Sequence, residues 1–206
     1  YIVLLLFAFI PLYPKFPLQN IPGTFVAVRL EDVLIAFPIG FWGIYITLSH
    51  RLKNFFHDTL NQTIMLVFFA GLVSLISANF LTHTVVSHIS FLHWLRRAEF
   101  MMLLPVAATV VKNKKQLFWI LGVLSFVVIL VNTYGLGQQY LNWPVISTTN
   151  SEFSKGLVLR LTPDARVNST FAGHYDLAVF LAMVLVIASS LFFVSKKIVK
   201  VWILLL

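Results

Sequence analysis

The sequence has no cysteine, and charged residues make up only 11% of its 206 positions. The absence of cysteine excludes disulfides, thiolate metal sites and cysteine nucleophiles. Soluble globular chains average about 25% charged residues, whereas this chain is 59% hydrophobic with a mean hydropathy of +0.91. These values indicate an integral membrane protein that crosses the bilayer several times.

Acidic residues are also scarce, since 7 Asp and Glu stand against 15 Lys and Arg and give a net charge of +8. This excess favours an anionic partner, either lipid headgroups or an anionic substrate. No nucleic-acid partner is expected, because no basic helix or aromatic platform stands clear of the apolar runs. The sequence also has no P-loop, Rossmann glycine pattern, HExxH motif or nucleophile elbow, so we expect no cofactor.

Five apolar runs approach the length of a membrane-spanning helix, which needs roughly 20 apolar residues. They are Val33–Leu48, Thr63–Phe80, Leu95–Val111, Leu117–Tyr134 and Tyr175–Val194. We predict an all-α, polytopic bundle of transmembrane helices that forms one domain over residues 1–206. Shorter apolar runs at Tyr1–Ile10 and Trp202–Leu206 predict partial spans at both ends, so we expect the chain to be a fragment of a longer protein.

Lysines and arginines are distributed differently among the loops. Seven of the nine lysines follow the first, third and fifth predicted spans, which makes these loops cytoplasmic by the positive-inside rule. The loops at 14–30, 81–94 and 135–174 then face outward. Five of the six arginines lie on this outer side, against the rule: Arg29, Arg96, Arg97, Arg160 and Arg166. Arginine forms forked contacts with phosphate and carboxylate, so these residues predict an anion-binding surface.

The third outer loop, Gly135–His174, is longer than a connection between two helices requires. Within it, Leu157–Leu161 predicts a short strand or an interfacial segment. Near its end, Arg166 and the polar residues 168–170 gather donors ahead of a helix expected to start near Tyr175, whose dipole favours an anion. The alternative is an interfacial arginine followed by a polar helix cap.

Two further groups of charges stand at the outer ends of predicted spans. Arg96 and Arg97 open the third span, and Glu99 is close enough in sequence to pair with either. Such charges at the membrane edge predict a water-filled, phosphate-binding cavity or, equally well, snorkelling side chains with one ion pair. Arg29 precedes the two acidic residues 31–32 at the start of the first span, for which pairing with the helix dipole is the simpler interpretation.

The histidines divide into two groups. His83, His88 and His93 are spaced by five residues and so share no helix face, and we expect no metal site from them. His174 adjoins the Arg166 segment, and a histidine can transfer a proton near neutral pH.

The run Arg166-Val167-Asn168-Ser169-Thr170-Phe171-Ala172-Gly173-His174-Tyr175-Asp176-Leu177-Ala178 resembles the signature of the O-antigen ligase and O-antigen polymerase family. In that family an arginine is followed a few residues later by a small residue or Thr and then Phe, by a short polar turn, and by a helix that opens with Leu-Ala. The layout before it is similar too, with an Arg-Leu-Glu-Asp helix start and a long outer loop. The sequence departs from the family in the turn, where Gly173-His174-Tyr175-Asp176 replaces an Asn-Pro-Asn-like turn.

The resemblance implies a metal-independent glycosyl transfer on the outer face of the bacterial inner membrane. The donor would be an undecaprenyl-diphosphate-linked glycan, and the acceptor a growing glycan or a lipid A core. Arg166 matches the signature arginine of the family and is expected to bind the diphosphate. Further candidate substrate-binding residues are Arg96, Arg97, Arg29 and His174. The catalytic base is expected in an outer loop beyond Leu206.

Two other functions remain open from the residues alone. One is a non-enzymatic transporter of a lipid-linked glycan or an anion, with the same arginines lining its binding cavity. The other is a membrane scaffold whose arginines are only interfacial anchors. An inverted repeat of the spans after Leu206 would favour the transporter, whereas a long outer loop with Arg and His would favour the enzyme.

Overall fold

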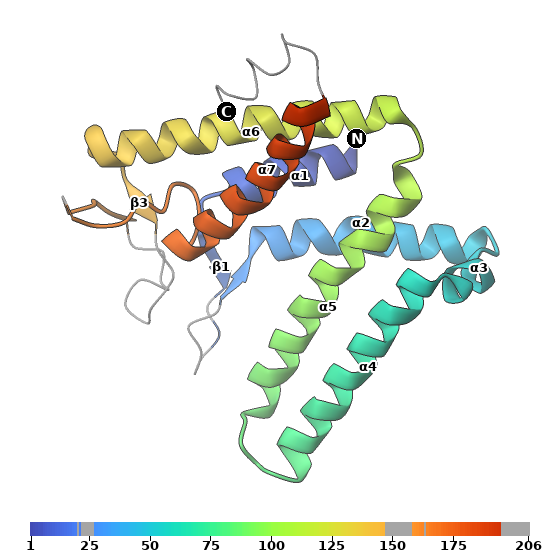
Figure 1. The fold of residues 1–206 in the computed structure, drawn as a ribbon. Helices are drawn as coiled ribbons and strands as arrows, with labels where there is room; N and C mark the ends of the chain where they lie inside the picture. The colour runs from blue at the N-terminus through green and yellow to red at the C-terminus, as the bar shows by residue number, and fades with distance from the viewer. Residues whose placement is uncertain (20, 22–26, 147–157, 163, 195–206) are drawn as a thin grey trace. The chain divides into compact units, whose positions relative to one another are not determined.

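The computed structural model describes residues 1–19, 21, 27–146, 158–162 and 164–194, and it is 75% helical. Figure 1 shows its elements along the chain. In order they are α1 (Ile2–Leu12), β1 (Pro17–Gln19), β2 (Val28–Arg29), α2 (Leu30–Leu48), α3 (Leu52–His57), α4 (Thr59–Phe80), α5 (Ser87–Val110), α6 (Lys114–Tyr140), β3 (Val145–Ile146), β4 (Val158–Leu159) and α7 (His174–Val194).

Within the described ranges, four helices are long and apolar enough to cross a membrane: α2, α4, α6 and α7. The chain is therefore mostly helical and has the character of a membrane protein, as its composition predicted. The third predicted span, Leu95–Val111, lies almost entirely within α5, but α5 is not among these four. Every stretch of α5 long enough to span contains Arg96, Arg97 and Glu99, which lower its hydropathy. The number of spans therefore stays a prediction.

The ends of the elements differ from the sequence predictions in several places. The apolar run at the amino terminus forms the short helix α1, whereas Trp202–Leu206 lies outside the described residues. The predicted strand within Leu157–Leu161 is present as β4, which pairs antiparallel with β3. The helix α6 ends at Tyr140 rather than at Tyr134, so the long loop begins later than predicted. The extra turns are held by loop residues packed against them, as described below.

The contacts within the chain group into two compact units. One consists mainly of residues 30–116 and contains α2, α3, α4 and α5. The other consists mainly of residues 3–29 and 117–206 and contains α1, α6, α7 and the four short strands. The single domain expected over residues 1–206 stays a prediction, and each unit is described here by itself.

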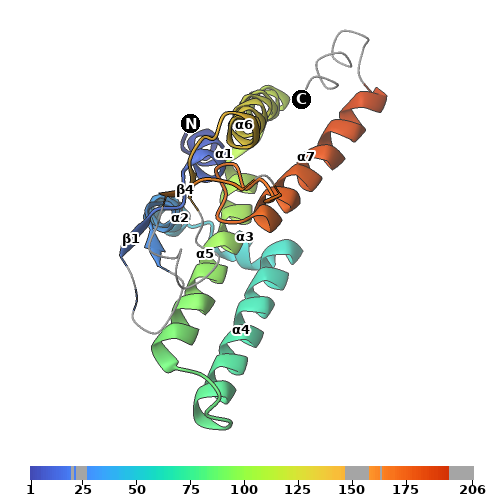
Figure 2. The same ribbon diagram turned by 90° about the vertical axis from the view of Figure 1, so that its left-hand side faces the viewer.

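In the 30–116 unit, α4 and α5 form an antiparallel hairpin whose helices lie side by side in Figures 1 and 2. Two tryptophan indole groups form hydrogen bonds that connect α5 to α4 and to α2. The Trp94 Nε1 on α5 donates a hydrogen bond to the Phe68 carbonyl on α4 at 3.3 Å. The Trp42 Nε1 on α2 donates to the Thr109 hydroxyl on α5 at 3.2 Å. Both bonds satisfy a donor that would be costly to leave unpaired in an apolar setting.

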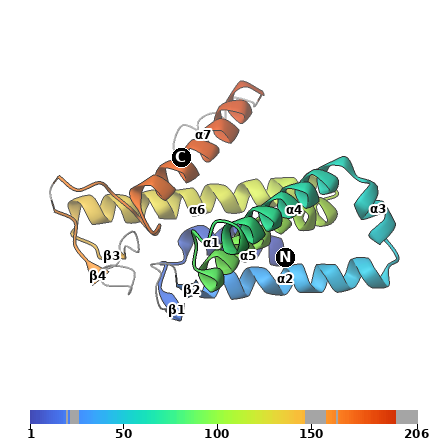
Figure 3. The same ribbon diagram turned by 90° about the horizontal axis from the view of Figure 1, so that it is seen from below.

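In the other unit, the core lies where three segments meet. Val127 and Val131 of α6 are completely buried and contact Phe171, which precedes α7. Leu12 of α1 and Phe180 of α7 pack against this core. Figure 3 shows α7 beginning beside α6 and then diverging from it, and only 6% of its apolar stretch is buried. The start of α7 is therefore fixed by packing, while its remainder exposes apolar side chains.

Candidate functional site

The segment before α7 is held against α6 by one buried amide side chain. Gln138 is 1% exposed. Its Oε1 accepts a hydrogen bond from the Ser169 backbone N–H at 2.8 Å, and its Nε2 donates to the Ser169 carbonyl at 2.9 Å. The same Nε2 also donates to the Pro144 carbonyl at 3.1 Å. One side chain therefore fixes both ends of the connection between α6 and α7.

The conformation of Ser169 completes this attachment. Its φ of 51° lies in the left-handed region, which is uncommon for residues other than glycine and turns the chain at this point. Its hydroxyl donates to the Val131 carbonyl at 2.7 Å, and the residue is 2% exposed. The close approach depends on Gly135, because a Cβ there would lie 3.1 Å from the Val167 Cγ1.

Thr170 makes a second attachment, which joins the same segment to α1. Its hydroxyl donates to the Pro11 carbonyl at 2.5 Å. Pro11 lies near the carboxyl end of α1, where helix carbonyls have no partner within the helix. The hydroxyls of Ser169 and Thr170 therefore bond to backbone carbonyls and do not gather around an anion. Both hydroxyls have a structural role here, which is to attach the segment to α6 and α1 and differs from the helix cap that was the alternative.

Arg166 and His174, by contrast, face each other at the start of α7. The Arg166 Nη1 and the His174 Nε2 are 3.3 Å apart. Since a guanidinium has donors only, this contact requires Nε2 to accept and the ring proton to sit on Nδ1. The Tyr175 ring lies against the imidazole, with ring centroids 4.1 Å apart. The Arg166 and Tyr175 side chains are exposed, so the guanidinium is accessible to a ligand.

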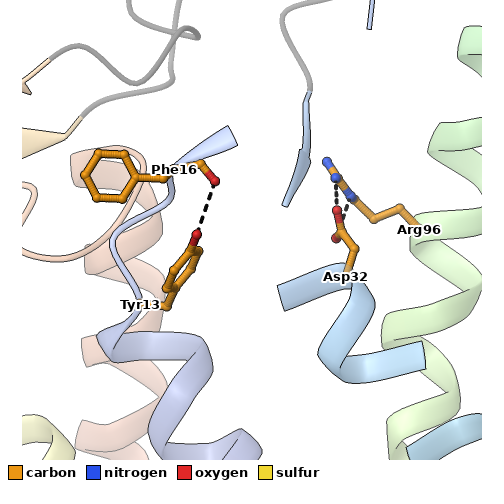
Figure 4. Close-up of polar contacts among 4 residues, drawn as sticks. All are labelled: Tyr13, Phe16, Asp32 and Arg96. Carbon is orange, nitrogen blue, oxygen red and sulfur yellow. Dashed lines mark hydrogen bonds and ion pairs between the residues drawn. The ribbon is translucent and has the colours of Figure 1, made fainter. Parts of the chain in front are cut away.

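Arg96 has a partner that local spacing did not predict. Its guanidinium pairs with the Asp32 carboxylate of α2, with Nε donating to Oδ1 at 3.1 Å and Nη2 bonding to Oδ2. Figure 4 shows this two-point contact. It joins residues that are 64 positions apart, which local spacing does not reveal. This forked ion pair joins α2 to α5, and the local pairing of Arg96 or Arg97 with Glu99 stays a prediction.

The remaining predicted site residues occupy separate places. Arg97 is exposed and lines a groove between α4 and α5. Arg29 lies in β2 opposite Pro17 of β1. In the link between α1 and β1, the Tyr13 hydroxyl donates a hydrogen bond to the Phe16 carbonyl at 3.4 Å (Figure 4). Arg96 and Arg97 belong to the 30–116 unit, whereas Arg29, Arg166 and His174 belong to the other.

The predicted histidine positions are also on different elements. His83 lies in the turn between α4 and α5 with a φ of 51°, whereas His88 and His93 lie on α5. Over the described ranges there is no group of three His, Cys, Asp or Glu side chains arranged to hold a metal ion.

Sequence reasoning missed two residues of this site. Gln138 was assigned to the loop because α6 was expected to end before it. Tyr175 is predicted only as the beginning of a helix. The sequence did contain a signal for Gln138. This polar residue lies four positions after Tyr134, so it shares a helix face with Tyr134 if the apolar helix continues.

Comparisons with protein-family models, with curated proteins and with solved structures found no match to this chain.

Proposed function

We propose that the protein is a membrane glycosyltransferase of the O-antigen ligase or polymerase type, acting on the outer face of the bacterial inner membrane. It transfers a glycan from an undecaprenyl-diphosphate carrier to a growing glycan or to a lipid A core. One observation carries the proposal. An exposed arginine, at the position of the signature that the sequence resembles, is held by a histidine at the start of a membrane helix.

The surroundings of Arg166 favour a preorganised ligand contact. The residues that follow it are fixed by Gln138 and by the hydroxyls of Ser169 and Thr170. The guanidinium therefore extends from an anchored backbone, and the bond to His174 restricts its rotation. A binding group held in this way loses less entropy when the ligand arrives.

The charge of Arg166 suits the leaving group of the proposed reaction. The acceptor hydroxyl oxygen forms a bond to the anomeric carbon and loses its proton to a general base or to water. The bond from that carbon to the diphosphate oxygen breaks, and the electron pair leaves with the diphosphate. Negative charge therefore grows on this oxygen, and a guanidinium that donates to it stabilises the transition state. The amino-terminal dipole of α7 acts in the same direction.

The experiment uses the full chain in liposomes with an undecaprenyl-diphosphate oligosaccharide and an acceptor. We expect release of undecaprenyl diphosphate together with lengthening or modification of the acceptor. Arg166→Ala should lower kcat/KM by about 10²–10³-fold, as expected for loss of one donor to a developing oxyanion. Arg166→Lys should restore little of this, because an ammonium lacks the planar fork. Arg160→Ala is the control, since Arg160 is exposed in the same connection.

Movement of the labelled carrier across the bilayer without release of diphosphate would contradict the enzyme and favour a transporter. Transfer at the wild-type rate by Arg166→Ala would retain the enzyme and exclude Arg166 from its site.

A further inference from the structure

A groove of about 460 Å³ lies along the α4–α5 hairpin. Its apolar wall is formed by Leu75 and Ala78 of α4, Val86 of the connecting turn and Ile89 of α5. At its inner end Trp94 closes over α4, because Gly71 leaves no Cβ there to hold the ring away. The volume falls within the range of roughly 300–1,000 Å³ that is usual for sites of small ligands.

The polar side of this groove carries the positive charge of Arg97 beside the imidazole of His93. His93 and Arg97 both line it, one helical turn apart on α5, and both are exposed. None of the lining residues is acidic. Arg96 pairs with Asp32, whereas in the part of the chain that the structure describes Arg97 has no carboxylate or carbonyl partner. Long side chains on a helix lean toward its amino terminus, which places this guanidinium over the groove.

Exposed apolar residues continue the groove along the same two helices. Val67 precedes Gly71 by one turn on α4, and Phe100 and Leu104 follow Arg97 on α5. Because α4 and α5 are antiparallel, these residues extend the groove away from the connecting turn, toward the bilayer interior if that turn faces outward as predicted. A ligand that follows this surface has a charged end at Arg97 and an apolar end beyond it.

We propose that this groove binds the headgroup region of an anionic phospholipid of the bilayer. The phosphodiester lies against His93 and Arg97, the headgroup alcohol lies in the groove between the apolar walls, and the glycerol and acyl chains run over Phe100 and Leu104. The one guanidinium charge matches the single negative charge of a phosphodiester, and the imidazole can donate a hydrogen bond to its oxygens. A diphosphate carries more charge, so this ligand is distinct from the proposed glycan donor. The inference does not depend on the proposed glycosyl transfer.

Native mass spectrometry of the delipidated full chain tests this proposal. We would add dioleoyl phosphatidylglycerol or dioleoyl phosphatidylcholine and compare the fraction of protein that retains one lipid. We expect about fivefold preference for the anionic lipid, since one basic residue at a membrane surface contributes an effect of this size. Arg97→Gln should abolish the preference, and Arg160→Gln, which removes the same charge elsewhere, should leave it unchanged. Ala78→Leu, which fills the groove, should reduce retention of both lipids.

Several outcomes would overturn the proposal. Equal retention of the two lipids by the wild type would exclude recognition of the phosphodiester charge. Equal losses in Arg97→Gln and Arg160→Gln would show a general charge effect rather than a site. Displacement of phosphatidylglycerol by one equivalent of undecaprenyl diphosphate would assign the groove to the carrier lipid. Displacement by millimolar inorganic phosphate would show that the acyl chains contribute nothing, whereas failure of phosphate to displace the lipid is the expected result.

Discussion

Replacement of Gln138 by leucine is expected to loosen the whole connection between α6 and α7. Leucine has a volume similar to that of the glutamine side chain, which is 1% exposed, but it cannot form the three hydrogen bonds of the amide. The Ser169 N–H and carbonyl then remain buried without these partners. A buried polar group left unsatisfied costs about 1–3 kcal/mol, and the hydroxyl of Ser169 keeps its own bond to Val131. We therefore expect Gln138→Leu to lower the free energy of unfolding by about 2–4 kcal/mol.

Two measurements check this expectation. Titration of the protein from detergent into dodecyl sulfate micelles gives the free energy of unfolding. Limited proteolysis by trypsin reports local opening, because Arg160 and Arg166 are exposed within the connection and cleavage rises as the segment opens more often. Cleavage at these two sites should increase in Gln138→Leu under conditions where α6 itself stays folded.

Gln139 supplies the matched control, because it is the next residue of α6 and its side chain is exposed. Gln139→Leu should change the free energy of unfolding by less than about 0.5 kcal/mol and leave the cleavage rate unchanged. Equal stability and equal cleavage in the two variants would refute the claim that Gln138 holds the connection in place.

Three further experiments test contacts within each of the two units. Gly137→Ala should destabilise the protein, because the Trp143 ring occupies the position of a Cβ there. Gly122→Ala on the same helix meets nothing within 4 Å and should be neutral or stabilising. Thermal denaturation compares the two variants, and equal midpoints would contradict the packing of Trp143 on Gly137. Thr170→Val should lower the free energy of unfolding by about 0.5–1.5 kcal/mol through loss of the hydrogen bond to the Pro11 carbonyl of α1. An unchanged unfolding midpoint in dodecyl sulfate would contradict this prediction. A double-mutant cycle of Asp32→Asn and Arg96→Gln should give a coupling of about 1 kcal/mol or more, since the side chains are only 13% and 25% exposed; additive effects would exclude the ion pair.

The sequence predicts most of the helices, because long apolar runs leave few alternatives for a chain in a bilayer. The runs that became α2, α4, α6 and α7 were all identified. Their ends were not, since polar interfacial residues continue a helix when a neighbouring segment packs on them. The carboxyl-terminal turn of α6 is the clearest example: Gly137 accommodates Trp143, and no local pattern reveals this contact.

The candidate site was predictable in part. Arg166 and His174 were predicted as site residues of one segment because they lie close together in sequence, and the structure places them in contact. The partners of Ser169 and Arg96 lie 31 and 64 positions away, and such contacts depend on how the helices pack. For the same reason, hydroxyls that suggested an anion site are engaged in holding the backbone. The remaining arginines lie in two units, so their shared role as a substrate surface stays a prediction.

Binding of the leaving diphosphate by Arg166 is the central claim, and a direct affinity measurement tests it. The full chain in detergent would be titrated with undecaprenyl diphosphate and with undecaprenyl monophosphate, for the wild type, Arg166→Ala and Arg160→Ala. We predict that Arg166→Ala weakens diphosphate binding by about tenfold or more, because hydrogen bonds to charged groups contribute about 1.5–3 kcal/mol. Arg160→Ala should bind like the wild type. Equal diphosphate affinity in wild type and Arg166→Ala would contradict the claim.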